Sequence, residues 1–163
     1  MPDLLVKLYD IDFDPNGQIE KNMRGQDIFI KRACIVDKHI ILDFVSENFG
    51  QGWTNECECA MLRNPVSCYI AVKDKKIIGF ACYDAVAKGF FGPTGVKAEF
   101  RGKGVGSGLL FKCLNSMKEC GYGYAVIGWV GEAKDFYAKQ AGAVEIGDSP
   151  PNKSVYKNMI SQE

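Results

Sequence analysis

Residues 101–106 read Arg-Gly-Lys-Gly-Val-Gly and have the composition of a phosphate-binding loop. They follow an apolar segment that ends at Val96 and lead into an apolar stretch with helical spacing. Glycines leave backbone N–H groups uncovered by Cβ atoms, and at a helix start these groups and the helix dipole attract anions. We therefore predict a loop that holds a pyrophosphate. Its candidate contacts are Arg101, Gly102, Lys103, Gly104, Val105, Gly106 and Ser107.

Two common phosphate-binding motifs do not match this loop. A Walker loop needs Gly, four residues and Gly-Lys-Ser/Thr, and the chain has no such run. A dinucleotide fingerprint needs Gly-x-Gly-x-x-Gly, but its last position falls on Ser107 or Leu109 when it starts from Gly102 or Gly104. The pattern that fits is Arg-x-x-Gly-x-Gly between a strand and a helix. A glycine-rich turn without a ligand is the alternative.

The segments around the loop alternate between strand and helix patterns. Apolar and β-branched runs predict strands at 4–9, 28–32, 67–73, 77–83, 90–96, 124–130, 144–146 and 154–160. Helical spacing predicts helices at 37–49, in a short segment capped by Thr54 or Asn55, at 105–119 and at 132–140. Glycines and a proline within 90–96 predict a bulge or break in that strand. The order predicts an α/β fold, with a mixed central sheet of about seven strands flanked by about four helices.

Three features resemble the GNAT superfamily of N-acetyltransferases. The order of elements from Ile28 onward is similar to its fold, and residues 101–106 match its pyrophosphate loop. Residues 133–143, with Tyr137 ahead of Gly142, are similar to the helix in which a tyrosine of the family precedes a glycine. Residues 90–96 and 121–131 also resemble GNAT domains found beside bacterial N-acetylglucosaminidases.

The resemblance implies a single acetyl-CoA-dependent domain over residues 1–163, with residues 1–27 as an added strand and loop. It also implies a sheet splayed between its fourth and fifth strands. There Gly95 and Val96 would offer backbone hydrogen bonds to the pantetheine arm and the thioester. Many family members have an Asn that touches the cofactor near the position of Val130. This chain lacks that Asn, so the contact is expected to be missing or to come from backbone.

Acetyl transfer to an amine requires an unprotonated amine, a polarised thioester carbonyl and a stabilised leaving thiolate. The resemblance implies Tyr137 as the proton donor to the departing sulfur, and an ordinary core tyrosine is the alternative. Asp84 is the nearest acid ahead of residues 90–96 and is our candidate base. A water chain or a partly neutral amine is an equal alternative.

The resemblance implies that the connection between the first two helices of the fold covers the acceptor site. Near this connection lie Trp53, Asn55 and Glu56. A tryptophan suits the apolar face of a sugar ring, and a carboxylate suits an amine. A loop-anchoring tryptophan on a solvated acidic face is the alternative.

We expect direct N-acetylation of a small primary amine in a ternary complex, because no cysteine lies in the loop or the flanking strand. Our first choice of acceptor is an amino sugar such as glucosamine. Acetylation of peptide or protein N-termini is one rival function, and a non-catalytic acyl-CoA sensor is another.

The charge balance and the lengths of the apolar runs limit the kinds of partner that the protein can have. The chain has 20 Lys and Arg against 20 Asp and Glu, which argues against a nucleic-acid binder with a broad basic surface. No apolar run approaches the roughly 20 residues that span a bilayer, and the start lacks the order of a signal peptide. We expect a cytoplasmic protein with no membrane partner, and a homodimer is one option for its assembly.

The cysteines and a calcium-like segment raise the question of metals. Seven cysteines, several of them in apolar segments, indicate free thiols in a reducing compartment. The closely spaced pair Cys57 and Cys59 has no second pair, and His39 is distant in sequence. Residues 12–23 match part of an EF-hand loop, but Met23 stands where the bidentate glutamate belongs. We expect no metal, and a solvated turn at residues 12–23.

Overall fold

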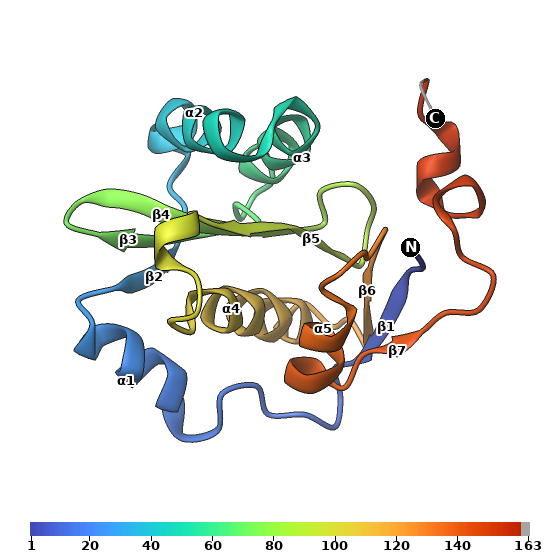
Figure 1. The fold of residues 1–163 in the computed structure, drawn as a ribbon, viewed down its shortest axis with the longest axis horizontal. Helices are drawn as coiled ribbons and strands as arrows, with labels where there is room; N and C mark the ends of the chain where they lie inside the picture. The colour runs from blue at the N-terminus through green and yellow to red at the C-terminus, as the bar shows by residue number, and fades with distance from the viewer. Residues whose placement is uncertain (161–163) are drawn as a thin grey trace.

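A mixed sheet of seven strands forms the centre of the computed structural model, which describes residues 1–160 (Figure 1). The spatial order of the strands is β2-β3-β4-β5-β6-β1-β7, and every neighbouring pair is antiparallel except β5 and β6, which are parallel. The predicted α/β fold is confirmed. The strands are β1 (Leu4–Lys7), β2 (Phe29–Arg32), β3 (Cys68–Lys73), β4 (Lys76–Tyr83), β5 (Phe90–Val96), β6 (Tyr124–Ile127) and β7 (Val144–Glu145).

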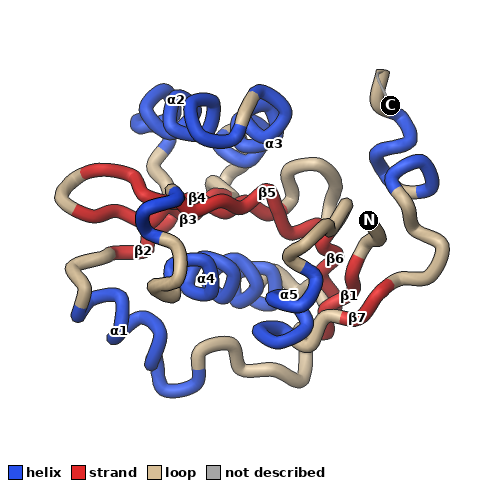
Figure 2. The backbone as a smooth tube through the Cα atoms, viewed as in Figure 1, coloured by secondary structure: helices blue, strands red, loops and turns tan. Residues whose placement is uncertain are grey.

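Helices cover both faces of the sheet (Figures 1 and 2). On one face lie α2 (Lys38–Phe49) and α3 (Gln51–Met61). On the other lie α1 (Gln18–Gly25), the long α4 (Val105–Glu119) and α5 (Lys134–Ala141). The described residues therefore hold five α-helices, one more than the approximate number predicted, because the N-terminal segment contributes α1.

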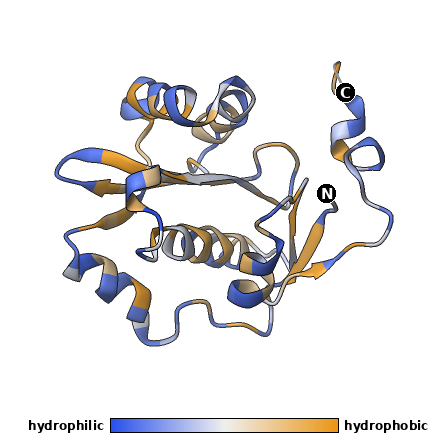
Figure 3. Cartoon of the chain, viewed as in Figure 1, coloured by the Kyte–Doolittle hydropathy of each residue, from blue (hydrophilic) through white to orange (hydrophobic). Residues whose placement is uncertain are grey.

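Apolar side chains fill both layers between the helices and the sheet. In Figure 3, which colours the chain by hydropathy, hydrophobic residues mark much of the central strands and of α4. Under α4, Leu109 and Leu114 are fully buried, and under α2 the same is true of Ile41 and Val45, which pack in one cluster with Phe80. Full burial of such a side chain is worth about 1.5–3 kcal/mol. This two-sided core holds β4 and β5 rigid in the middle of the molecule.

The turn predicted between the first two strands is wrong. Residues Pro15–Gly17 form a 3-10 helix, and α1 follows directly. The carboxylate of Asp14 accepts hydrogen bonds from the amides of Ile19 (2.8 Å) and Glu20 (3.2 Å), so it satisfies two of the free amides at the helix start. Met23 is buried against the core. The acidic spacing that imitates an EF-hand thus belongs to a helix start.

The strand predicted at 154–160 is also wrong. Within that segment Val155–Asn158 forms a short 3-10 helix, which follows another at Pro151–Lys153. The position between β6 and β7 is occupied by β1, which pairs with both. The buried carboxylate of Asp3, just ahead of β1, accepts a hydrogen bond from the hydroxyl of Ser154 and so ties the C-terminal segment to the sheet.

Several boundaries differ from the predictions. Only Gly50 separates α2 from α3, so α3 begins at Gln51 rather than after Thr54 or Asn55, and the Thr54 hydroxyl donates to the Gly50 carbonyl (2.8 Å). The strand predicted at 124–130 ends at Ile127. The irregularity predicted in β5 is confirmed, because the β4–β5 register shifts between Ala81 and Tyr83.

Candidate functional site

The sheet opens between β5 and β6. The two strands pair only at Phe90 with Val126 and at Phe91 with Ile127. Beyond this point residues 92–96 stay with β4, whereas the chain after β6 turns toward the N-terminus, where the Val130 amide donates to the Pro2 carbonyl (3.0 Å). We call the wedge between residues 92–96 and 128–130 the splay. The Val130 amide is therefore already occupied.

Backbone groups of β5 point into the splay. The Lys97 amide donates to the Ile78 carbonyl (2.8 Å), so the next facing pair, Val96 and Gly79, is of the type without mutual hydrogen bonds. In such pairs the N–H and C=O groups point away from the partner strand. Val96, and by the same alternation Thr94, therefore direct their amides toward β6, whereas Gly95 faces β4. Thr94 is therefore a candidate backbone contact that the sequence did not indicate.

The glycine-rich loop opens α4 next to the splay. Gly102 and Gly104 have φ angles of 76° and 87°, which side-chain-bearing residues rarely adopt. The first backbone bond of the helix runs from the Gly108 amide to the Gly104 carbonyl (3.0 Å), so the amides of residues 105–107 have no acceptor inside the helix. Together with Arg101 and Lys103 these amides can bind an anion. The Arg101 side chain also donates to the Val96 carbonyl (3.2 Å) and links the loop to β5.

Helix α1 supports this loop from outside. The side-chain amide of Gln26 donates to the Lys103 carbonyl (3.2 Å), and its backbone carbonyl accepts from Lys73 (2.7 Å). A Cβ on Gly104 would lie 3.1 Å from the terminal methyl of Met23. This contact could not be predicted from local sequence patterns, because 77 residues separate Gln26 from Lys103.

Tyr137 of α5 lies beside the base of the splay. Its ring meets that of Phe91 edge-on, with centroids 6.1 Å apart, and burial raises its pKa to about 12. The ring is buried, but no described residue hydrogen-bonds its hydroxyl. Residues 1–160 contain no fully enclosed side-chain oxygen or nitrogen without a partner, so the hydroxyl keeps contact with open space. It is thus a protonated donor that is free to serve a ligand.

The predicted acceptor residues occupy α3 on the opposite face. Trp53 packs on Phe49 (5.5 Å between centroids) and is 39% exposed. Glu56, one turn further on, is partly buried, and burial raises its pKa to about 7. Asn55, unlike Trp53 and Glu56, is an exposed residue whose side chain already accepts a hydrogen bond from Gln51 (2.9 Å).

Tyr156 brings the C-terminal segment to the same opening. Its ring lies 5.1 Å from that of Trp129, and a Cβ on Gly128 would lie 2.6 Å from its hydroxyl oxygen. Burial and the charges of Glu56 and Asp3 raise the pKa of Tyr156. Tyr156 was not among the predicted site residues, because residues 154–160 have the pattern of a strand.

Comparison with protein families decides the assignment. The sequence model described as the acetyltransferase (GNAT) family matches residues 37–143, more than half of the chain. The chain belongs to the acetyltransferase (GNAT) family. The family is one of acetyltransferases, which is the reaction class that the loop and the splay led us to expect. Among curated proteins, none matches this sequence.

Solved structures share the GNAT fold at low identity. A fungal multi-domain GH3 β-N-acetylglucosaminidase with a GCN5-related glucosamine N-acetyltransferase region matches with a TM-score of 0.71 and 18% identity, over 89% of this chain and 19% of that one. A GNAT family acetyltransferase from Brucella melitensis in complex with acetyl-CoA matches with a TM-score of 0.53 and 20% identity, over 76% and 91%. A ribosomal-protein-alanine N-acetyltransferase from Brucella melitensis biovar Abortus matches with a TM-score of 0.56 and 16% identity, over 74% of this chain and 96% of that one. This chain thus spans only about a fifth of the fungal protein.

In this GNAT domain the carboxylate of Asp84 holds a loop together. It accepts hydrogen bonds from the Gly89 amide (2.7 Å) and from the Tyr122 hydroxyl (2.9 and 3.0 Å). The Asp84 amide donates to the carbonyl of Phe90, at the opposite end of β5 from Val96. A strand of that length separates the two ends by about 20 Å. Its role as the base stays a prediction that this placement does not favour.

Three cysteines far apart in sequence meet under α3. The sulfur atoms of Cys57, Cys68 and Cys82 lie within 4.8 Å of one another and are completely buried. Burial raises the pKa of Cys82, and a hydrogen bond with Cys57 raises that of Cys68. Hydrogen bonds with Cys68 and Cys82 lower the pKa of Cys57 to about 5, so the three sulfur atoms form one hydrogen-bonded cluster inside an apolar layer. The predicted absence of a metal stays a prediction.

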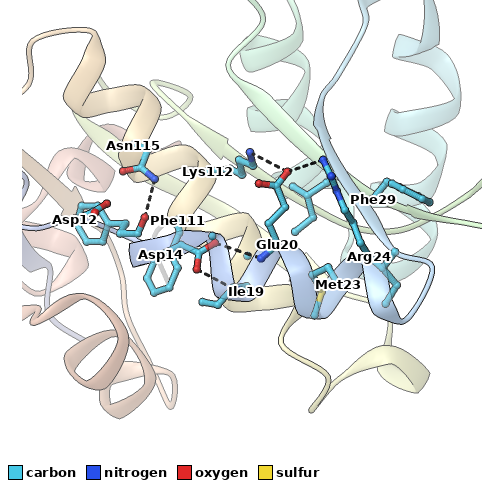
Figure 4. A pocket seen from close by; sticks show the side chains of 15 residues that line it. Asp12, Asp14, Ile19, Glu20, Met23, Arg24, Phe29, Phe111, Lys112 and Asn115 are labelled. Atoms are coloured by element: carbon cyan, nitrogen blue, oxygen red, sulfur yellow. Dashed lines mark hydrogen bonds and ion pairs between the residues drawn. The ribbon is translucent and has the colours of Figure 1, made fainter.

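A cavity of about 310 Å³ lies away from the splay, between α1, β2 and α4 (Figure 4). Several of its polar side chains already have partners: Glu20 pairs with Arg24 (3.4 Å) and Lys112 (3.6 Å), and Asn115 donates to the Phe13 carbonyl (3.1 Å). We therefore assign it no ligand. Within residues 1–160, no helix has both the length and the apolar character that crossing a membrane requires.

Proposed function

We propose that this protein transfers the acetyl group of acetyl-CoA to the primary amine of a small molecule, and that the acceptor is an amino sugar such as glucosamine. The observation that carries the proposal is the open splay, with the amides of Thr94 and Val96 directed into it between the anion-binding loop and Tyr137. The family supplies the reaction class. The free cysteines fit a cytoplasmic location.

The residues present suit acetyl-CoA along a continuous path. The amides of residues 102–107, with Arg101 and Lys103, would hold the pyrophosphate. The Val96 and Thr94 backbone would pair with the pantetheine arm as an added strand would. The Val96 N–H would then donate to the thioester oxygen as negative charge develops on it. Gly95 allows β5 to lie close to α2, because a Cβ at this position would lie 2.5 Å from the Phe49 ring.

Tyr137 would stabilise the leaving thiolate. Its raised pKa keeps the hydroxyl protonated at neutral pH, so it can donate a hydrogen bond to the sulfur as the carbon–sulfur bond breaks. A thiol is a stronger acid than this tyrosine, so the hydrogen bond contributes more than complete proton transfer. The transfer would be direct, because the thiol cluster under α3 is enclosed and cannot carry an acyl group.

The acceptor side supports an amino sugar. Trp53 and Trp129 are both about 40% exposed, and flat aromatic faces suit the C–H face of a sugar ring. Glu56 adds a carboxylate that can bind a primary ammonium group. The structural match to a chain with a glucosamine N-acetyltransferase region, over 89% of this chain, favours the same choice.

An acceptor panel tests the proposal. The protein is incubated with acetyl-CoA and glucosamine, polyamines or peptides, and thiol release is followed. We expect turnover with glucosamine and none with N-acetylglucosamine, the matched control whose amine is already blocked. Turnover with peptides alone would favour N-terminal acetylation, and binding of acetyl-CoA without turnover on any amine would favour the sensor. Either result would overturn the proposed acceptor.

A further inference from the structure

We propose that Glu56 is the general base that accepts the proton of the acceptor amine; this rests on the proposed function. From the sequence alone, Glu56 was predicted only as a substrate contact and Asp84 as the base. The structure places the two carboxylates in opposite situations. Asp84 is fully used by Gly89 and Tyr122, whereas Glu56 is not engaged.

The carboxyl group of Glu56 has no protein partner. No hydrogen bond or ion pair joins it to any residue in 1–160, whereas Glu58 on the same helix pairs with Lys38 (3.2 Å). Burial without a partner is costly for a carboxylate, so such groups are uncommon unless a ligand completes them. Because no fully enclosed oxygen in the described chain lacks a partner, Glu56 must face open space. A half-buried, unpaired carboxyl at an opening is what a proton acceptor requires.

The two faces of the sheet show where Glu56 lies relative to the splay. Phe91 and Ile127 pack in the α4 layer with Tyr137, so the alternating neighbours Phe90 and Gly128 face the other side. Tyr156 covers that side at the point where β6 leaves β5, with its hydroxyl against Gly128. Helix α3, which carries Glu56, packs against β5 on this side of the sheet, and the charge of Glu56 contributes to the raised pKa of Tyr156.

Glu56, on the α3 side, and Tyr137, on the α4 side, therefore lie on opposite faces of the sheet at β5. A thioester that enters from the α4 side would meet an amine that enters from the α3 side. This arrangement provides an acid on the sulfur side and a base on the amine side.

The pKa of Glu56 lies near neutral pH because the surrounding residues that the structure describes bury it and bring no cation close to it. Burial is the sole resolved cause of the shift to about 7, and no cation of the described chain lowers it. Tyr156 is the titratable neighbour from the C-terminal segment, and its raised pKa keeps it uncharged. A base whose pKa lies close to the working pH is half deprotonated there and can still take a proton effectively.

The proton and electron balance of the step is complete. Glu56 takes one proton from the ammonium group, and the nitrogen lone pair attacks the thioester carbon. The carbon–sulfur bond breaks with its electron pair on sulfur, where Tyr137 donates a hydrogen bond. The thiolate takes the second nitrogen proton and becomes the thiol, and Glu56 releases its proton to water. One proton leaves per acetyl group transferred.

The test compares Glu56→Gln with Glu47→Gln, an exposed glutamate of α2 with no role in the site. The wild-type kcat should rise with pH through an ionisation near 7, because only the carboxylate form accepts a proton. Glu56→Gln should lower kcat at least about 100-fold and abolish this limb. Glu47→Gln should keep both, and Glu56→Asp should keep a titrating limb at reduced rate. Acetyl-CoA affinity, measured by calorimetry, should be the same in all four proteins.

Stability provides a second readout. Burial raises the pKa of Glu56 above its unfolded value, so its carboxylate form opposes folding as pH rises through about 7. Glu56→Gln should therefore raise the unfolding midpoint at pH 8 and leave it unchanged at pH 4. A variant that simply failed to fold would lower it at both.

The outcomes separate this inference from the proposed function. An active wild type whose Glu56→Gln variant keeps the rate and the pH limb would overturn Glu56 as base and leave the function intact. Loss of the limb in Asp84→Asn instead would move the role to Asp84. A wild type that binds no acetyl-CoA would overturn the proposed function itself.

Discussion

The side-chain amide of Gln26 donates a hydrogen bond to the backbone carbonyl of Lys103 over 3.2 Å. The peptide between Lys103 and Gly104 is trans, so its carbonyl and the Gly104 N–H point in opposite directions. Holding the carbonyl toward α1 therefore turns the Gly104 amide away from α1, to the side on which a phosphate can dock. The N-terminal helix thus orients the loop although it adds no group to the site.

We predict that Gln26→Ala weakens coenzyme A binding about 3- to 10-fold, because one hydrogen bond is worth about 0.5–1.5 kcal/mol. Isothermal calorimetry with coenzyme A measures this change. Gln18→Ala, on the exposed side of the same helix, serves as the control and should bind like the wild type. Equal affinities for all three proteins would show that the loop holds its shape without Gln26.

Gly104→Glu should remove coenzyme A binding. A side chain is strained at φ 87°, its Cβ would meet Met23 at 3.1 Å, and the carboxylate would repel the pyrophosphate. We expect affinity to fall at least about 100-fold with a folded circular-dichroism spectrum. Gly147→Glu adds the same charge at an exposed glycine with no atom near its Cβ and should bind normally. Unaltered affinity in Gly104→Glu would contradict the assignment of the loop.

Tyr137→Phe should lower kcat about 10- to 100-fold, because the leaving thiolate loses its hydrogen-bond donor. Acetyl-CoA affinity should not change, since the ring still packs on Phe91. Steady-state kinetics and calorimetry together check both statements. A kcat equal to that of the wild type would identify Tyr137 as a packing residue.

Gly128→Ala should disturb the acceptor side alone. The new Cβ would lie 2.6 Å from the Tyr156 hydroxyl, so the tyrosine must shift. We expect KM for the amine to rise severalfold, with coenzyme A affinity unchanged. The control is Gly123→Ala, where no atom lies near the added Cβ. An unchanged KM would mean that Tyr156 lies outside the acceptor site.

Thiol labelling should divide the seven cysteines by burial. Cys34 and Cys120 are exposed and should react first in the native protein. Cys59 is partly exposed and should follow more slowly. The remaining four, Cys57, Cys68, Cys82 and Cys113, are buried and should react only after denaturation. A chromogenic disulfide reagent with mass spectrometry measures the order, and fast native labelling of Cys57 would contradict the enclosed cluster.

Features that depend on a few consecutive residues could be predicted from the sequence. The positive φ angles of Gly102 and Gly104 follow from their type, and the start of α4 at Val105 follows from the apolar spacing after them. The hairpin between β3 and β4 was evident in the same way, with Asp74 and Lys75 in left-handed conformations at its turn. These local signals identified the loop, β5 and the family.

The acceptor side and the place of the N-terminal segment were decided by tertiary structure. Residues 18–25 became a helix because burial of Met23 against the core outweighed the local turn signals. The edge beside β6 was taken by β1, which left the C-terminal segment free to bring Tyr156 toward Glu56, 100 residues earlier in the chain. Which distant segments pair and what they enclose depends on packing over the whole chain, and no local pattern of residues encodes it.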